Sequence, residues 1–377
     1  MAARYQVRLK SQSGSVVAVL TNWRSLEYTL RVNATDSHVF TIDGESAVVP
    51  SFALDAQLEV WRRDIAAGIP WYLDYEGFHR TPVDQTNEHG LSTFTSYGRG
   101  YDDLIRRREV AYPANSSQTE KTGAGETVIK SYVNENAGPG AVSPPRLLAS
   151  GVTTGLAMQA DGGAGTSWHG HKAYQNLLEA IQDVALVTQV DFKTVGMGPA
   201  AFEFQAKAKP WGADRSVVGL NTMTGLNAAG NPPVVFALGF DNMGIPVYSN
   251  NRSEEVNAVY VLGQGQEADR MVVLRTDPVA IADSPWNRCE VSRNANMDTD
   301  LAGLQSTGDA ALEEFASRES FHFSVLQIPS LLYGRNYFIG DLVTARYKTI
   351  ERNFQITEVR VSVATGREQI DIGVTNV

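Results

Sequence analysis

The chain has 377 residues and a formal net charge of −10, with 32 Lys and Arg against 42 Asp and Glu. This acidic balance argues against a general nucleic-acid binder, and the length predicts two to four domains. The single cysteine, Cys289, excludes an intramolecular disulfide and a four-thiolate metal site.

Short runs with an apolar residue at every second position fill the first 110 residues, and glycine, proline and asparagine separate them. They lie at residues 5–10, 26–32, 39–43, 58–63, 71–77 and 91–97. Such alternation is typical of half-buried strands, and so many short strands at close spacing predict a small barrel or sandwich. Residues 1–110 are therefore predicted to form a first β-rich domain, a small barrel or a sandwich.

The pattern changes after Arg108. Apolar residues recur at helical spacing over 125–136 and, more strongly, over 173–187. Two alternating runs follow at 190–195 and 201–209. The spacing predicts an α+β middle domain over residues 111–235.

Strand-like alternation returns in residues 236–377, which are predicted to form a second β-rich domain. A helix is expected at 309–318, within an insertion near 300–318, from the spacing of its alanine, leucine and phenylalanine residues. The most regular runs lie at 321–325, 341–347, 354–363 and 369–374. A β-rich unit at each end is compatible with an ancient duplication, although no repeat of short period is present.

Groups able to perform a reaction are sparse in this sequence. His169-Gly-His171 is the most metal-like pair, but no third ligand follows at a recognisable spacing, and a Gly-rich surface loop explains it better. Cys289 lacks a surrounding nucleophile motif and is interpreted as a lone thiol near the end of a strand or loop.

Two pairs of adjacent carboxylates invite comparison with glycosidases. Asp102-Asp103 and Glu313-Glu314 are neighbours in sequence, so their side chains point in different directions and neither pair can face one substrate. Both pairs are expected on solvated faces. We predict no catalytic residue, no cofactor-binding residue and no metal ligand.

Arg106, Arg107 and Arg108 form a compact basic run at the end of the first predicted domain. Arginine is favoured at interfaces for its planar fork of donors, so the run is a candidate subunit interface that helps to close a ring. An exposed strand end explains the same run equally well.

Several segments, taken in order, resemble the first domain of tail-tip hub proteins of long-tailed bacteriophages. They are Trp23–Leu30, Leu58–Asp64, Trp71–Arg80 and Thr93–Arg108, the last containing Gly98-Arg-Gly-Tyr-Asp-Asp-Leu-Ile-Arg-Arg-Arg. Tyr337–Ala345, Gln355–Val363 and Gln369–Val374 resemble the closing barrel of the same proteins. The resemblance covers nearly the whole chain and is one of pattern and order.

The resemblance implies a mainly β fold with α+β insertions, built on two related small β-barrel domains of baseplate-hub type. It implies a homotrimeric ring that joins the distal tail or tail tube protein to a tip or fibre protein. DNA would pass through the lumen without specific binding, for which an acidic wall is suited. The expected location is the virion tail, assembled in the host cytoplasm, since no secretory signal and no membrane-spanning stretch is apparent. The chain stops directly after its last predicted strand, so no enzymatic extension is expected.

Two other functions stay open on the sequence. A cell-wall hydrolase or endopeptidase would use His169, His171 and the nearby Asp161 in the middle domain. A carbohydrate-binding tail module would use some of the six Trp and fourteen Tyr, although an aromatic content of 9% is ordinary.

Overall fold

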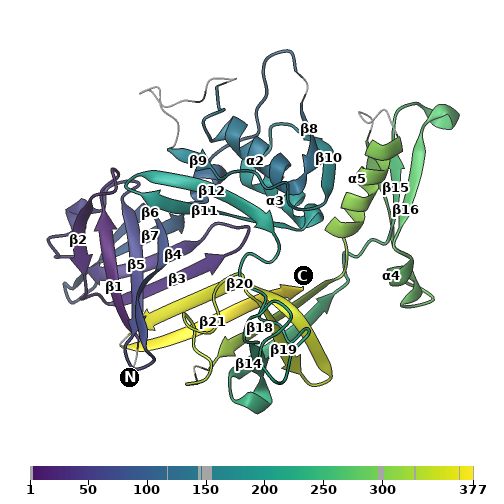
Figure 1. The fold of residues 1–377 in the computed structure, drawn as a ribbon. Helices are drawn as coiled ribbons and strands as arrows, with labels where there is room; N and C mark the ends of the chain where they lie inside the picture. The colour runs from purple at the N-terminus through teal and green to yellow at the C-terminus, as the bar shows by residue number, and fades with distance from the viewer. Residues whose placement is uncertain are drawn as a thin grey trace.

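The computed structural model describes residues 3–116, 118–142, 146, 155–295, 301–326, 328–364 and 366–376. Its largest element is a 13-stranded sheet that contains strands from both ends of the chain (Figure 1). The strands are β1 (Arg4–Lys10), β2 (Val16–Leu20), β3 (Ser25–Arg31), β4 (Ser37–Asp43), β5 (Gln57–Asp64), β6 (Ile69–Thr86), β7 (Ser92–Gly100), β13 (Val235–Ala237), β14 (Met243–Asn251), β18 (Arg318–Val325), β19 (Leu342–Tyr347), β20 (Ile350–Ala364) and β21 (Arg367–Asn376).

The alternation seen in the sequence places one face of each strand in the core. In β1, for example, Tyr5, Val7 and Leu9 are buried, and the residues between them are partly exposed. The main path runs β14-β18-β21-β20-β3-β4-β7-β6-β5-β1-β2, and β13 joins it through β19, which pairs with β20.

The two ends of the chain meet where β20 pairs antiparallel with β3, from Arg31 opposite Glu358 to Ser25 opposite Ala364. One hydrophobic cluster accordingly takes side chains from both the first hundred residues and the last hundred and fifty. The expectation of a mainly β fold is confirmed. The path of the described strands does not close on itself, so the two separate barrels stay a prediction.

The middle of the chain forms an α+β layer on one side of the large sheet (Figure 1). It contains β8 (Thr119–Ala124), α2 (Gly125–Asn136), β9 (Leu156–Met158), β10 (Ser167–Lys172), α3 (Leu177–Thr188), β11 (Val190–Gly198) and β12 (Ala201–Ala208). α2 begins and ends where its sequence pattern predicts, whereas α3 begins later because Asn176 caps it by accepting a hydrogen bond from the Leu178 N–H at 3.1 Å. The helices and β11–β12 enclose a second hydrophobic cluster.

Asn33, in the turn between β3 and β4, joins this layer to the sheet. Its side-chain oxygen accepts the Phe192 N–H at 2.6 Å, and its amide donates to Asp191 at 2.9 Å. Asp191 also accepts from Gln355 of β20 at 2.5 Å. The layer therefore bonds to both ends of the chain at their junction.

A third unit projects from the C-terminal half (Figure 1). It contains β15 (Ala258–Leu262), β16 (Val272–Thr276), α4 (Pro278–Ala282), β17 (Glu290–Asn294) and α5 (Leu301–Glu314). β15 pairs with both β16 and β17, and α5 covers one face of this small sheet. The remaining short elements are α1 (Asp103–Arg106), η1 (Val49–Ser51), η2 (Leu238–Phe240) and η3 (Glu267–Asp269).

The helix predicted at 309–318 is displaced. α5 ends at Glu314, and Arg318 already begins β18. Gly303 and Gly308 disfavour a helix by propensity, but the packing around Gly308 leaves little room for a side chain. A Cβ at Gly308 would lie 2.4 Å from Cγ of Arg275, so only glycine lets the helix approach the sheet this closely.

Candidate functional site

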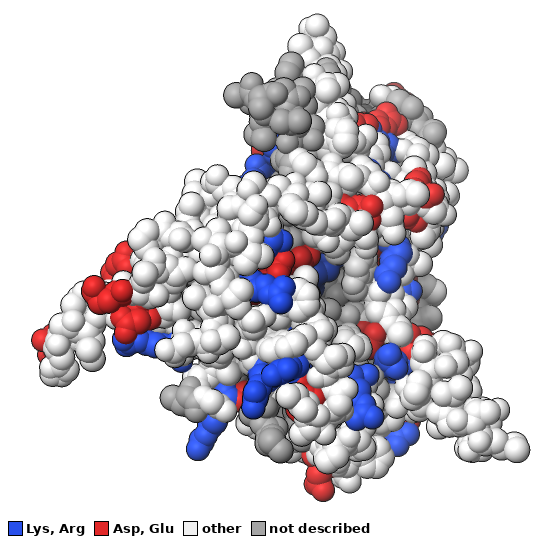
Figure 2. All heavy atoms as spheres, turned by 60° about the vertical axis from the view of Figure 1, so that its left-hand side comes forward, with Lys and Arg blue, Asp and Glu red and all other residues white. Residues whose placement is uncertain are grey.

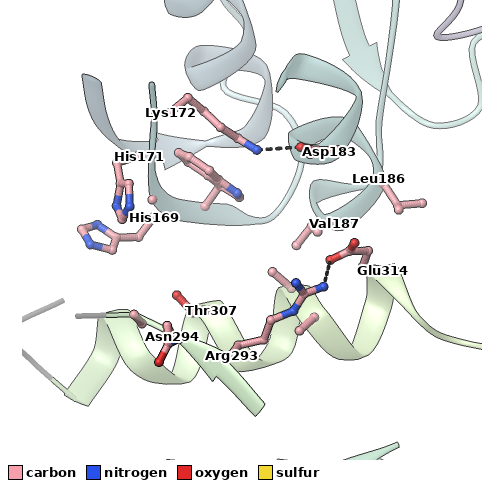
Figure 3. Close-up of a pocket in the computed structure, with 15 residues that line it drawn as sticks. His169, His171, Lys172, Asp183, Leu186, Val187, Arg293, Asn294, Thr307 and Glu314 are labelled. Carbon is pink, nitrogen blue, oxygen red and sulfur yellow. Dashed lines mark hydrogen bonds and ion pairs between the residues drawn. The ribbon is translucent and has the colours of Figure 1, made fainter. Parts of the chain in front are cut away.

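A cleft between the middle layer and the projecting unit is the leading candidate for a binding site (Figure 3). β10 and α3 form one wall, and β17 and α5 form the other. The cleft has a volume of about 280 Å³ and adjoins a second hollow of about 690 Å³ that shares His169 and Val187. Gln189 donates to Glu313 across the gap at 3.5 Å.

The charged side chains of the cleft are arranged in pairs. Lys172 Nζ lies 2.6 Å from Asp183, and Arg293 lies 2.9 Å from Glu314, as Figure 3 shows. Each cation therefore faces a carboxylate of its own wall. The two charges within each pair offset one another, so the cleft has no strong field of one sign.

The two histidines of the sequence motif both line this cleft (Figure 3). They lie on strand β10, so the expectation of a Gly-rich surface loop is wrong. His169 Nδ1 contacts Thr122 Oγ1 at 2.6 Å, and its Nε2 lies 3.6 Å from Glu120. Cross-strand pairing with β8, which the sequence pattern did not reveal, fixes the ring.

Asp161 does not join the histidines. Its carboxylate accepts hydrogen bonds from Thr127 Oγ1 at 2.6 Å and from the Gly163 N–H at 3.2 Å, and it does not line the cleft. The Thr127 hydrogen bond lowers the pKa of Asp161. Among the residues that the structure describes, no three His, Cys, Asp or Glu side chains are grouped to hold a metal ion.

Cys289 precedes β17 and is partly exposed, as expected for a lone thiol beside a strand. Glu313 and Glu314 are exposed, as predicted. The prediction of a solvated face for Asp102 and Asp103 is wrong, because both are buried.

Asp103 is the hydrogen-bond partner of two of the three arginines in the basic run. Arg106 Nε donates to it at 2.7 Å and Arg107 Nε at 2.6 Å, and Arg107 also reaches Asp55 at 3.0 Å. A fully buried carboxylate needs such counter-charges. Sequence reasoning missed this because a buried aspartate carries no local signature.

Arg108 differs from its neighbours. Its backbone carbonyl accepts the Leu177 N–H at 2.8 Å, while the structure gives its side chain no hydrogen bond or ion pair among the described residues. The role of Arg106, Arg107 and Arg108 in a subunit interface stays a prediction, and Arg108 is the one of the three that does not bind Asp103.

Comparison with known proteins identifies the family of this chain. A family model described as Siphovirus ReqiPepy6 Gp37-like protein matches residues 6–374. The chain belongs to this family. No curated protein matches it.

Solved structures show that the Gp37-like chain has the fold of prophage tail proteins along its whole length. The 43 kDa tail protein of prophage MuSo2 from Shewanella oneidensis superposes with a TM-score of 0.62 at 12% identity, covering 100% of this chain and 98% of that one. The tail protein from Neisseria meningitidis MC58 gives 0.57 at 12%, with 100% and 97% covered. The prophage tail protein gp18 from Listeria monocytogenes gives 0.54 at 11%, with 99% and 94% covered.

The surface of the Gp37-like chain carries charges of both signs. Figure 2 shows Lys and Arg mixed with Asp and Glu on one face, with broad uncharged areas between them. Such a face does not resemble the continuous basic stripe that tracks nucleic acid. No helix in the described part of the chain is long and apolar enough to cross a membrane.

Proposed function

We propose that this chain is a structural hub subunit of a phage-like tail tip or baseplate, and that it performs no reaction of its own. Three copies form a ring that joins the tail tube or distal tail protein to the tip or fibre protein, and DNA passes through its lumen. The observation that carries the proposal is the family match over residues 6–374, together with a fold shared with tail proteins over nearly their full length.

The division into three domains, at residues 1–110, 111–235 and 236–377, belongs to this proposal. The second hydrophobic cluster draws most of its side chains from residues 128–206 and the rest from residues 78–110, and the first cluster draws on residues 5–94 and 234–374. A hub built in this way holds its two β-rich parts in a fixed relation, which favours a rigid ring.

Exposed apolar strand edges support assembly. β2 ends the main path of the 13-stranded sheet, and Val16, Val17 and Val19 on it are each about half exposed. An uncharged edge of this kind pairs or packs readily with another chain. Subunit contact protects such an edge in a ring.

The mass of the purified protein tests the ring. Mass photometry and negative-stain images are expected to show a closed assembly of three copies. Peptide mass spectrometry of purified virions is expected to detect the chain. A protein that stays a monomer at micromolar concentration and is absent from virions would overturn the proposal.

Charge reversal of Arg108 is expected to weaken the ring. Arg108→Glu leaves both arginine contacts of Asp103 in place, so the fold should persist while association weakens roughly five- to tenfold, about 1 kcal/mol. Mass photometry over a dilution series measures the change, with Arg99→Glu as an exposed control. Unchanged association would remove Arg108 from the interface.

The cleft is expected to hydrolyse no cell-wall polymer. Its cations are paired with carboxylates, and Asp161 lies outside it, so no acid, base and nucleophile converge there. A zymogram of the purified protein should show no clearing, and His169→Ala and His171→Ala should behave alike. Clearing that both variants abolish would establish an enzyme instead.

A further inference from the structure

An exposed tryptophan stands at the outer end of the projecting unit. Trp286 is 89% exposed and Val279 is 75% exposed, and both lie in the segment that connects β16 to β17. Single exposed apolar residues are common, but tryptophan is the residue most enriched among binding hot spots.

The segment that carries Trp286 is held rigidly, so its shape is prepared for binding. Asp277 caps α4 by accepting the Val279 and Ala280 N–H groups at 2.9 and 3.1 Å. Asn287 donates to the Ala280 carbonyl at 2.8 Å, and Arg252 contacts Asp283 at 2.5 Å. A rigid anchor loses little conformational entropy when it docks.

Exposed carboxylates lie in the segments next to this anchor. Asp277, Asp283 and Glu254 are all exposed. Asp277 caps α4, Asp283 pairs with Arg252, and the exposed Arg288 pairs with Glu290 at 2.7 Å, so carboxylates outnumber cations in this part of the surface. A partner surface that accepts the tryptophan should therefore be aromatic or apolar with a basic rim.

One such pocket exists on the chain itself. It has a volume of about 400 Å³, within the range of sites that hold ring-sized groups. Its walls include Tyr5, Thr21, Trp23, Arg63, Trp71 and Val363.

Arginines give this pocket its basic rim. Arg63 stacks on Trp71 with its guanidinium carbon 4.6 Å from the ring centroid, and Arg4 lies exposed beside it. Glu368 also lines the pocket, but Arg62 engages it at 2.9 Å. Trp23 Nε1 and Arg63 Nε are buried without a hydrogen-bond partner in the part of the chain that the structure describes. The wall is thus electropositive and open to an aromatic group.

The anchor and the pocket lie on opposite sides of the molecule. In Figure 1 the N-terminus and β1 are at the left, and α4 is at the far right. One chain cannot fill its own pocket in this arrangement. Contact between two different patches of identical copies is head-to-tail, and such contacts generate rings when the rotation closes.

We propose that the Trp286 loop of one copy docks into the Trp23–Trp71 pocket of the next copy and so links neighbouring subunits. This contact rests on the proposed ring and supplies an interface for it. The indole enters between Trp23 and Trp71, and the acidic rim of the loop faces Arg4 and Arg63.

Cross-linking tests the contact directly. The double variant Thr21→Cys/Pro285→Cys in a Cys289→Ser background places one thiol at the pocket and one beside Trp286. Mild oxidation of the assembled protein is expected to give covalent dimers and trimers, because the two sites lie too far apart within one chain. Thr21→Cys/Met223→Cys, whose second thiol replaces a fully exposed methionine elsewhere, should give no ladder.

Truncation of single side chains tests the same contact through the strength of subunit association. Trp286→Ala and Trp71→Ala should each weaken association about tenfold or more, whereas Met223→Ala should not. Charge reversals Glu254→Lys and Arg4→Glu should each weaken it, and their combination should recover part of the loss.

The outcomes separate this contact from the ring. A ring that survives both tryptophan truncations and yields no cross-link overturns the contact and leaves the hub intact. A wild-type chain that never assembles overturns both. Retention of a soluble cell-wall glycan by the pocket, lost in Trp71→Ala while the ring persists, would also overturn the contact.

Discussion

Replacing Arg62 by alanine is expected to lower the free energy of unfolding by about 3–5 kcal/mol, the usual result of removing one partner from a buried ion pair. Arg62 is almost fully buried and bonds to Glu368 at 2.9 Å, to the Tyr72 hydroxyl at 3.1 Å and to the Tyr333 carbonyl at 3.0 Å. Burial opposes its charge, but Tyr5 and Glu368 outweigh burial and raise its pKa.

The effect should be large because Arg62 joins the two ends of the chain. Its own strand, β5, belongs to the first hundred residues, and Glu368 and Tyr333 belong to the last fifty. Alanine would leave Glu368 and the Tyr333 carbonyl without their charged donor in a poorly solvated region.

Guanidinium titration followed by tryptophan fluorescence measures the loss. Arg360→Ala is the matched control, since Arg360 of β20 pairs with Glu27 of β3 at 2.8 Å and so also joins the two ends of the chain, but on the surface. An exposed pair of this kind contributes about 0–1 kcal/mol. Equal losses in the two variants would show that Arg62 does not hold the junction together.

Asp102→Asn should change the pH dependence of stability. Burial raises the pKa of Asp102 to about 7, while Lys193 acts in the opposite direction and Asp36 in the same one. The variant keeps a side-chain oxygen that can accept the Thr194 N–H, which Asp102 accepts at 2.8 Å. It loses the ability to ionise, and an NH2 group replaces the second carboxylate oxygen.

The sign follows from proton linkage. In the unfolded chain an aspartate titrates near 3.9, so between about pH 4 and pH 7 the folded chain binds more protons at this site. The stabilising contribution of Asp102 is complete below about pH 4 and is lost as the pH rises through 7. The free energy of unfolding of the asparagine variant should therefore rise relative to that of the wild type as the pH rises, by up to about 4 kcal/mol.

Unfolding titrations at pH 4.5, 6 and 7.5 test this expectation. Asp84→Asn, on the exposed part of β6, should follow the wild type at every pH. If the free energies of unfolding of Asp102→Asn and the wild type changed in parallel with pH, the pKa of Asp102 in the folded protein would be an ordinary one.

Local signals in the sequence predicted most of the individual elements. Alternation located β1, β3, β4 and the last strands, because a half-buried strand must place every second side chain in the core. The pattern over 125–136 predicted α2 with its correct ends, since Gly125 and Ala137 bound an apolar face. Strand β10 with its two histidines was missed, because glycine-rich flanks dilute the alternation that identifies a strand.

The sequence by itself determined a mainly β chain with a central α+β region, an acidic charge and a lone thiol. Only the tertiary structure decided that β3 pairs with β20, that Arg62 bridges the two ends of the chain, and that Asp103 binds Arg106 and Arg107. Periodicity determines which face of a strand is buried, but not which distant strand lies beside it. The partner of a buried charge depends on that pairing, so it emerges only once the chain is folded.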